Sequence, residues 1–242
     1  FPDLSKYDEI AIDLETKDPE LKTMGSGSVI GKSNIVGVAV AVHDWRGYYP
    51  IAHEGGGNMD KSMVIKWFQD ILNTEATKIF HNAMYDVCFI RAAGLKINGM
   101  IVDTMIAGSL VDENRFRYDL GSMGRDYLGI GKNEAVLKET ADLWGVDAKS
   151  EMYKLPAMYV GEYAEQDAEL TLKLWQEMKK QMYHEDVEDI FKLETELFPC
   201  LVDMRFLGVR VDTEAAYELK QQLLTEEKEC LYKVKKETSI DV

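Results

Sequence analysis

The stretch EIAIDLE, residues 9–15, combines an apolar, β-branched pattern with two acidic side chains. Such a composition is typical of a buried or half-buried strand. Because side chains alternate between the two faces of a strand, Asp13 and Glu15 point to the same side, about 7 Å apart along the chain. With 43 Asp and Glu among 242 residues, such a pair also fits a solvated strand edge. Whether this acidic pair has a function depends on which side chains from other segments lie beside it.

Four further strands are predicted around this one, from short apolar runs bounded by turn residues. They are IVGVAVAV (35–42), GYYPIA (47–52), TKIF (77–80) and a short segment at 100–103. The first two indicate a hairpin that turns at 44–47 and lies beside residues 9–15. Antiparallel strands followed by an alternation of strands and helices predict an α/β fold with a mixed sheet flanked by helices.

Helical spacing of apolar residues predicts the helices that surround this sheet. They are expected at 60–72, from Asn82 to Gly94, in segments from 104 to 144 with a break at 129–131, and at 160–182, 187–207 and 213–237. Asn82 has the side chain of a helix N-cap. The segment 16–34 is rich in Gly, Ser, Pro and Lys, which predicts a long exposed loop.

The net charge of −15 is unfavourable for a free-standing, high-affinity nucleic-acid binder, because phosphates repel such a surface. We therefore expect weak affinity for DNA, and phosphate chemistry only where cations are supplied. No apolar run of 18 residues and no signal-peptide pattern occurs, and the three cysteines are widely spaced. These features predict a soluble, cytoplasmic protein with reduced thiols and no membrane partner.

Two further segments carry acidic residues at positions that could serve chemistry. Asp86 lies one turn into the helix opened by Asn82, where it would also simply complement the positive helix end. Tyr163 and Asp167 stand four residues apart and therefore share one helix face, which could equally be a solvated face among neighbouring acids. Each segment alone permits both interpretations.

Together the acidic residues favour a metal site. Four carboxylates on strand ends and one helix face repel one another unless cations lie between them, and two divalent ions about 4 Å apart are the apparatus for hydrolysing a phosphodiester. Carboxylate ligands without His or Cys indicate two Mg²⁺ ions, with Mn²⁺ as a substitute. Such ions would also supply the local positive field that the chain lacks.

Three motifs of the sequence resemble the tyrosine-type DEDD superfamily of 3′-5′ proofreading exonuclease domains: DLET (13–16), HNAMYD (81–86) and YAEQD (163–167). The stretches DTMIAGSLVDE and YDLGSMGRDYLG are also similar to that family. The resemblance implies a ribonuclease H-like α/β fold, with a mixed five-stranded sheet flanked by helices and a C-terminal helical extension. It also implies removal of 5′-deoxynucleoside monophosphates from a single-stranded DNA 3′ end.

The resemblance assigns the site residues as well. Asp13, Glu15, Asp86 and Asp167 would hold the metal ions, and Tyr163 would orient the attacking water together with Glu15. Thr16 and Asn82 match positions that touch the terminal nucleotide, and His81 stands beside them as a third substrate-binding candidate. Asp103 is expected to be structural, as a pairing or capping residue of the next helix.

The tail LETELFPCLVDMRFLGVRVDTEAAYEL resembles the junction at which family A DNA polymerases pass from exonuclease to polymerase domain, and the long loop is similar to bacteriophage-type enzymes. This predicts an exonuclease domain at 1–185 and an extension at 186–242 that resembles the start of a polymerase domain. A polymerase domain in the same chain or complex would then be a partner. The first residue, Phe1, and the helical end also suggest a piece of something longer.

Two alternatives stay open at this point. One is an RNA-trimming exonuclease of the same superfamily, which the polymerase-like tail disfavours. The other is a non-catalytic nucleic-acid-binding scaffold module, which would have no need to keep mutually repelling carboxylates.

Overall fold

The computed structural model describes residues 1–239, so the last three residues of the predicted extension, 240–242, lie outside the described part. The strands are β1 (Glu9–Lys17), β2 (Asn34–Val42), β3 (Trp45–Pro50), β4 (Thr77–Phe80) and β5 (Ile101–Asp103). The helices are α1 (Leu21–Met24), α2 (Gly27–Ile30), α3 (Lys61–Leu72), α4 (Ala83–Ala92), α5 (Thr104–Val111), α6 (Leu120–Leu128), α7 (Ala135–Trp144), α8 (Ala157–His184), α9 (Glu188–Leu207) and α10 (Thr213–Thr238). A short 3-10 turn, η1, covers Met152–Lys154.

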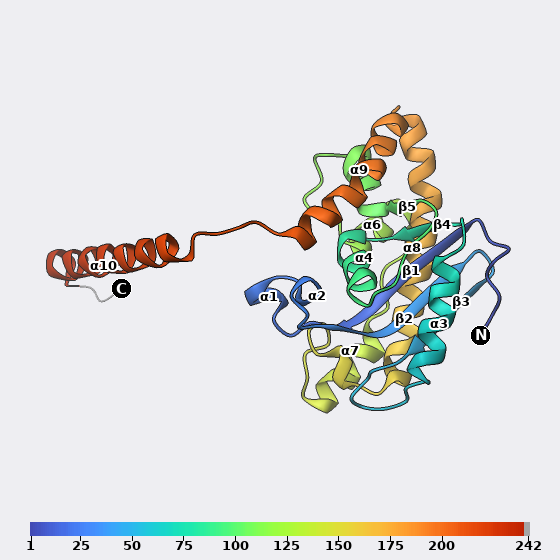
Figure 1. Ribbon diagram of the computed structural model, residues 1–242, viewed down its shortest axis with the longest axis horizontal. Helices are drawn as coiled ribbons and strands as arrows, with labels where there is room; N and C mark the ends of the chain where they lie inside the picture. The colour runs from blue at the N-terminus through green and yellow to red at the C-terminus, as the bar shows by residue number, and fades with distance from the viewer. Residues whose placement is uncertain (240–242) are drawn as a thin grey trace. The chain divides into compact units, whose positions relative to one another are not determined.

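The five strands form one mixed sheet in the order β3-β2-β1-β4-β5 (Figure 1). β1 lies at its centre, antiparallel to β2 and parallel to β4. The predicted mixed sheet and the hairpin beside β1 are confirmed. The predicted turn was placed too late, because Trp45 pairs with Val42 and the ladder leaves only residues 43 and 44 for the connection.

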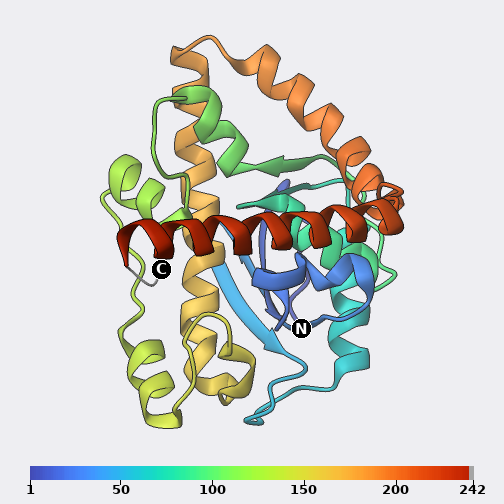
Figure 2. The same cartoon turned by 90° about the vertical axis from the view of Figure 1, so that its left-hand side faces the viewer.

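The two faces of β1 are covered by different helices, with α8 on one side of the sheet and α3 and α4 on the other (Figure 2). Ala11 of β1 belongs to the core cluster that includes Ala164 and Ala168 of α8. Because side chains alternate along a strand, Asp13 and Glu15 share the face of Ala11 and lie on the side of α8. Small alanine side chains in this interface let the helix approach the sheet closely.

The segment 16–34 is more structured than its composition predicted. β1 continues to Lys17, and the helices α1 and α2 follow, with Gly27 and Ser28 buried. The carboxylate of Asp18 accepts a hydrogen bond from the backbone N–H of Gly27 at 3.1 Å, and a Cβ on Gly27 would lie only 2.7 Å from an Asp18 oxygen. Gly27, which suggested flexibility, is therefore needed because the backbone at this position passes close to the side chain of Asp18.

Residues Phe1–Arg205 form one compact unit, and the described residues after Arg205 belong to a second. Most of α9 therefore packs with the sheet domain: Phe191 lies 5.5 Å from the ring of Trp175, and Phe198 and Val202 are buried. In α10 no described residue is buried. None of the helices in residues 1–239 combines the length and apolar character needed to span a membrane.

Candidate active site

The four predicted carboxylates come from three elements that meet at β1. Asp13 and Glu15 project from β1 toward α8, and Asp167 lies on the buried face of α8. Asp86, in the first turn of α4, accepts a hydrogen bond from the backbone N–H of Leu14 at 3.1 Å, which ties the start of α4 to the centre of the sheet. Asp86 and Asp167 are each only 5% exposed. The fold thus brings these acids together in a site with little water.

Burial, and after it mutual repulsion, raise the pKa values of the carboxylates in this site. Burial, followed by the nearby charge of Asp167, raises the pKa of Asp13 to about 7. Burial and then the charges of Asp13 and Asp167 raise the pKa of Glu15, and burial and Asp13 raise that of Asp86. Each carboxylate therefore lies close enough to another to disfavour its ionisation, so the cluster binds protons or cations readily.

Lys132, a residue that the sequence analysis did not single out, contributes the counter-charge. Its ammonium forms an ion pair with Asp167 and donates a hydrogen bond to the hydroxyl of Tyr163 at 3.3 Å. Burial opposes its charge, but Asp167 and then Asp13 and Glu15 favour it, so the pKa of Lys132 is raised and the side chain stays protonated. Nothing in the loop sequence GIGKNE distinguishes this lysine from a solvated one.

The donor chemistry of the cluster fits a divalent metal ion. All four side chains offer carboxylate oxygens, the ligand type that Mg²⁺ and Mn²⁺ prefer. Within residues 1–239, no three His, Cys, Asp or Glu side chains already form a group arranged to hold a metal ion. The Lys132 ammonium stands in as a cation beside Asp167 instead. The residues thus suit a cation, although their side chains are not in a coordinating arrangement.

The predicted substrate-binding residues lie beside the carboxylates. Thr16 follows a bulge in β1, and its hydroxyl forms a hydrogen bond with the hydroxyl of Tyr85 at 2.9 Å. Asn82 has an exposed side chain and a left-handed backbone with φ of 64°. Its predicted role as a side-chain N-cap is wrong, because no such hydrogen bond forms. The carboxylate of Asp103 accepts from the backbone N–H groups of Asn82 and Ala83 at 2.9 and 2.7 Å.

Asp103 also caps the next helix, because it accepts from the backbone N–H of Met105 at 2.8 Å. The prediction that Asp103 is structural therefore agrees with its contacts. One carboxylate satisfies the free N–H groups at the starts of both α4 and α5. It thereby holds the turn that presents His81 and Asn82.

His81 is held in one tautomer. Its Nδ1 lies 2.8 Å from the hydroxyl of Thr104, which in turn donates to the carbonyl of Phe80 at 3.2 Å. Nδ1 must therefore carry the hydrogen, and Nε2 is buried without a hydrogen bond of standard geometry to any described residue. Burial and then the charge of Lys132 lower the pKa of His81 to about 4, so the ring is neutral at physiological pH.

We expect His81 to make the fold sensitive to acid. Its pKa is about 4 in the folded protein against an ordinary 6.5, so between these values the unfolded chain binds more protons. The contribution of His81 to the free energy of unfolding should therefore fall as the pH drops through this window, by about 3 kcal/mol at most. This contribution opposes that of the carboxylates, whose pKa values are raised. In urea unfolding without metal, His81→Gln should therefore steepen the loss of stability as the pH rises, whereas His43→Gln, at an exposed position, should not. Equal slopes for the two variants would contradict this assignment.

Two tyrosines that the sequence analysis missed, Tyr85 and Tyr48, lie next to residues of the site. Tyr85 bridges Thr16 and the carboxylate of Asp18, which its hydroxyl reaches at 3.3 Å. Burial and the charges of Glu15 and Asp13 raise the pKa of Tyr48, which places its hydroxyl near them. That hydroxyl lies 2.6 Å from Nε2 of His53. Tyr85 could have been found as the residue before Asp86, but Tyr48 lies on a strand whose pattern carries no such signal.

Comparisons with known proteins show which family and fold this chain shares. A family model described as a 3′-5′ exonuclease matches residues 1–183. A DNA-directed DNA polymerase of Pseudomonas phage M6 is 33% identical over 238 residues, which are 93% of this chain and 35% of that protein. The chain thus spans about a third of the length of the phage relatives it matches.

Two solved structures show the same fold. NrnC from Brucella melitensis with bound Mg²⁺ superposes with a TM-score of 0.61 at 17% identity, over 85% of this chain and 89% of that one. The POL domain of Pol1 from M. smegmatis, in complex with DNA primer-template and dNTP, gives a TM-score of 0.64 at 12% identity, over 98% of this chain and 35% of that one. The predicted ribonuclease H-like fold, a mixed five-stranded sheet flanked by helices, is confirmed.

Proposed function

Because this chain belongs to the 3′-5′ exonuclease family of family A DNA polymerases, we propose that it hydrolyses the terminal phosphodiester of single-stranded DNA and releases 5′-deoxynucleoside monophosphates. The observation that carries this proposal is the convergence of Asp13, Glu15, Asp86 and Asp167 from β1, α4 and α8 in one buried cluster. Such a cluster is costly to keep unless cations occupy it during function.

In this proposal Asp13, Glu15, Asp86 and Asp167 hold two Mg²⁺ ions, for which Mn²⁺ can substitute. Bound there, the ions would supply the positive charge that offsets the carboxylates and stabilises charge developing on the phosphate and the leaving 3′ oxygen. The bound ions, rather than the protein surface as a whole, would thus create the local positive field that attracts DNA.

The protein groups position the water and the strand end. Burial and then Asp167 raise the pKa of Tyr163, so its hydroxyl stays protonated and can donate to the attacking water or the phosphate. Glu15, on the same side of the cluster, would accept a hydrogen bond from that water and so fix its orientation. Thr16, Asn82 and His81 would contact the terminal nucleotide.

The chain would act as the proofreading part of a larger polymerase, in the cytoplasm of a bacterium or a phage-infected cell. We propose that residues 1–185 form the exonuclease domain and that 186–242 resemble the start of a polymerase domain in the same chain or complex. The phage relatives, which are named as DNA polymerases and are about three times as long as this match, support that view.

A strand-degradation assay tests the proposal. With Mg²⁺, DNA labelled at its 5′ end should shorten one nucleotide at a time from the 3′ end, and chelation should stop the reaction. A matched RNA strand should be cut more slowly; faster loss of RNA would favour the RNA-trimming alternative. No cleavage of either strand, together with no heat of Mg²⁺ binding in calorimetry, would instead support a non-catalytic scaffold module.

A further inference from the structure

Tyr48 of β3 lies on the face of the sheet that carries the candidate metal-binding acids. Asp13 pairs with Ala39 of β2, and Ala39 pairs in turn with Tyr48, so these three side chains point to the same face. Glu15 pairs with Gly37 of β2, and a Cβ on Gly37 would lie only 2.0 Å from the hydroxyl oxygen of Tyr48. The hydroxyl therefore occupies the space that a side chain at Gly37 would fill, next to Glu15 on the neighbouring strand.

A buried histidine fixes the direction of this hydroxyl group. Nδ1 of His53 lies 2.9 Å from the carbonyl oxygen of Leu155, and because a carbonyl only accepts, Nδ1 carries the hydrogen. Burial lowers the pKa of His53, so its ring is neutral and Nε2 accepts from the Tyr48 hydroxyl at 2.6 Å. That hydroxyl has a single hydrogen, which it gives to His53 and not to the carboxylate of Glu15.

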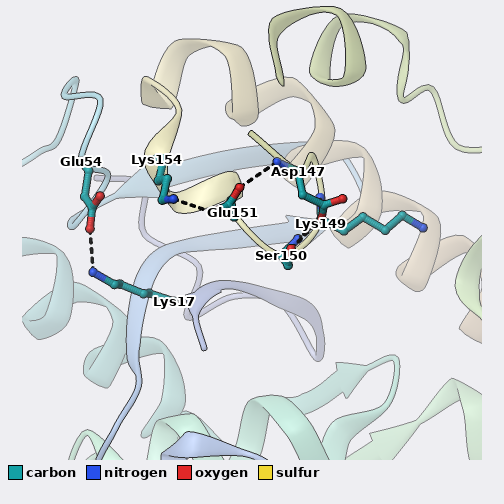
Figure 3. A network of polar contacts seen from close by, with 7 residues as sticks. All are labelled: Lys17, Glu54, Asp147, Lys149, Ser150, Glu151 and Lys154. Atoms are coloured by element: carbon teal, nitrogen blue, oxygen red, sulfur yellow. Dashed lines mark hydrogen bonds and ion pairs between the residues drawn. The ribbon is translucent and has the colours of Figure 1, made fainter. Parts of the chain in front are cut away.

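The loop that carries His53, residues 51–58, is held on several sides. The side chain of Asn58 accepts from the backbone N–H of His53 at 2.7 Å and donates to its carbonyl at 2.8 Å. Glu54 forms an ion pair with Lys17, at the end of β1, at 2.6 Å (Figure 3). These contacts fix the position of the histidine relative to the strand that carries the acids.

The same loop is joined to the segment that leads into α8. The backbone N–H of Ala157 donates to the carbonyl of Gly56 at 3.0 Å. A Cβ on Gly55 would lie 2.3 Å from the backbone nitrogen of Pro156, so the two backbones meet at a distance that only glycine allows. The start of α8, the helix of Tyr163, is thereby fixed against the histidine loop.

Tyr48 also packs against the part of α8 that carries Tyr163. Both tyrosines contact the cluster of buried side chains between α7, η1 and α8. A Cβ on Gly161 would lie 3.5 Å from Cδ1 of Tyr48, so α8 passes over this ring at close to van der Waals distance. The ring of Tyr48 thus lies against α8 just before Tyr163, while its hydroxyl lies next to Glu15.

We propose that Tyr48, with its hydroxyl held by His53, is a positioning residue for Glu15 and Tyr163, the two groups that would orient the attacking water. This inference rests on the proposed exonuclease function. The hydroxyl limits how far the side chain of Glu15 can turn, and the ring supports the turn of α8 before Tyr163. Because its hydrogen is given to His53, Tyr48 restrains Glu15 without competing with a cation or a water molecule for the carboxylate oxygens.

Tyr48→Phe removes one hydroxyl and keeps the ring, so it tests the role of that group directly. In cleavage of a 5′-labelled oligothymidylate at saturating Mg²⁺, kcat should fall by about tenfold, a typical cost of losing a group that orients a metal ligand. KM should change by less than about twofold, because Tyr48 does not touch the strand. A raised KM with unchanged kcat would make Tyr48 a strand-binding residue and overturn the inference.

Tyr49→Phe is the matched control, because it makes the same change one residue further along β3. Tyr49 points to the opposite face of the sheet, where its ring centroid lies 4.1 Å from that of Trp67. This variant should keep kcat within about twofold of the original chain. Urea unfolding of both variants shows whether they are equally stable. Equal kcat values for Tyr48→Phe and Tyr49→Phe would overturn the inference.

The partner of the hydroxyl gives a second test. His53→Gln keeps a donor for Leu155 and an acceptor for Tyr48, so kcat should stay within about threefold of the original value. His53→Leu has neither and should lose about as much activity as Tyr48→Phe, and the double variant should lose no more than either single variant. Additive losses would show that the two side chains do not act as a unit, which would overturn the role of His53.

Binding of Mn²⁺ without DNA separates this inference from the proposed function. In calorimetry, Tyr48→Phe should weaken Mn²⁺ binding by about tenfold, whereas Tyr49→Phe should not. If the original chain cleaves no DNA but the variants show this difference, the positioning of Glu15 stands and the exonuclease proposal fails. If the original chain cleaves DNA while both variants bind Mn²⁺ and react alike, the exonuclease proposal stands and the role of Tyr48 fails.

Discussion

Asp167→Asn is expected to lower the rate of 3′-terminal DNA cleavage by about 10³-fold or more, because a ligand worth several kcal/mol of charge stabilisation is lost. Asp167 is also the partner of Lys132, so the substitution removes one carboxylate oxygen from the centre of the cluster while its shape is kept. The loss should appear in kcat, because the substitution weakens an interaction that stabilises the negative charge formed in the transition state. Single-turnover cleavage of a labelled oligonucleotide with Mg²⁺ measures it.

The matched control for this substitution is Glu162→Gln, the same change of acid to amide on the same helix. Glu162 is exposed and accepts a hydrogen bond from Gln166 only one turn away, with no contact to the carboxylate cluster. Its activity should stay within about twofold of the original chain, because exposed helix pairs contribute little. Circular dichroism shows whether both variants fold. An active Asp167→Asn variant would remove the basis of the site assignment.

Removing the metal should make the stability of this protein fall as the pH rises. Burial and Asp167 raise the pKa of Asp13 to about 7, from an ordinary 3.8, and the pKa values of Glu15, Asp86 and Asp167 are raised as well. Between about pH 4 and 7 the folded chain therefore holds more protons than the unfolded chain. The free energy of unfolding should decrease across this window, by on the order of a few kcal/mol.

Divalent ions should reverse this trend, since they bind the ionised carboxylates of the folded state. Urea unfolding at about pH 5 and pH 8, with EDTA or with Mg²⁺, measures the effect. We expect a larger stabilisation by Mg²⁺ at the higher pH, and a weaker pH dependence in EDTA for Asp13→Asn. If Mg²⁺ stabilises the chain equally at both pH values, or if Asp13→Asn retains the full dependence, the carboxylates do not form one interacting cluster.

The parts of the site that sequence reasoning anticipated follow from local periodicity. Strand alternation fixes the common face of Asp13 and Glu15, and helical spacing fixes that of Tyr163 and Asp167. The hairpin beside β1 and the inward face of α8 follow from similar patterns, whereas the central place of β1 in the sheet comes from the structure alone. Once three such motifs are placed on neighbouring elements, their convergence requires only that the elements pack.

The parts that it missed depend on tertiary contacts. Lys132 comes from an irregular loop between α6 and α7, whose position no periodicity determines. Asn82 would be a good N-cap by residue type, but it has a left-handed backbone and its side chain points outward. Asp103, at the end of β5, instead accepts a hydrogen bond from the backbone N–H of Ala83 at the start of α4. Most of the segment 16–34 is exposed or partly exposed as predicted, but its short helices were missed, and Gly27 is buried where the backbone approaches Asp18.

The alanine-lined seam between α8 and the sheet has a consequence for natural variation in this chain. Ala164 and Ala168 are completely buried next to Ala11 and Ala39, and they lie on the same helix as Tyr163 and Asp167. A bulkier side chain there would lift the helix and carry Asp167 out of reach without altering any reacting group. We therefore expect that some substitutions abolish activity for steric reasons alone. At positions 164 and 168, the activity that remains should depend on the volume of the new side chain rather than on its polarity.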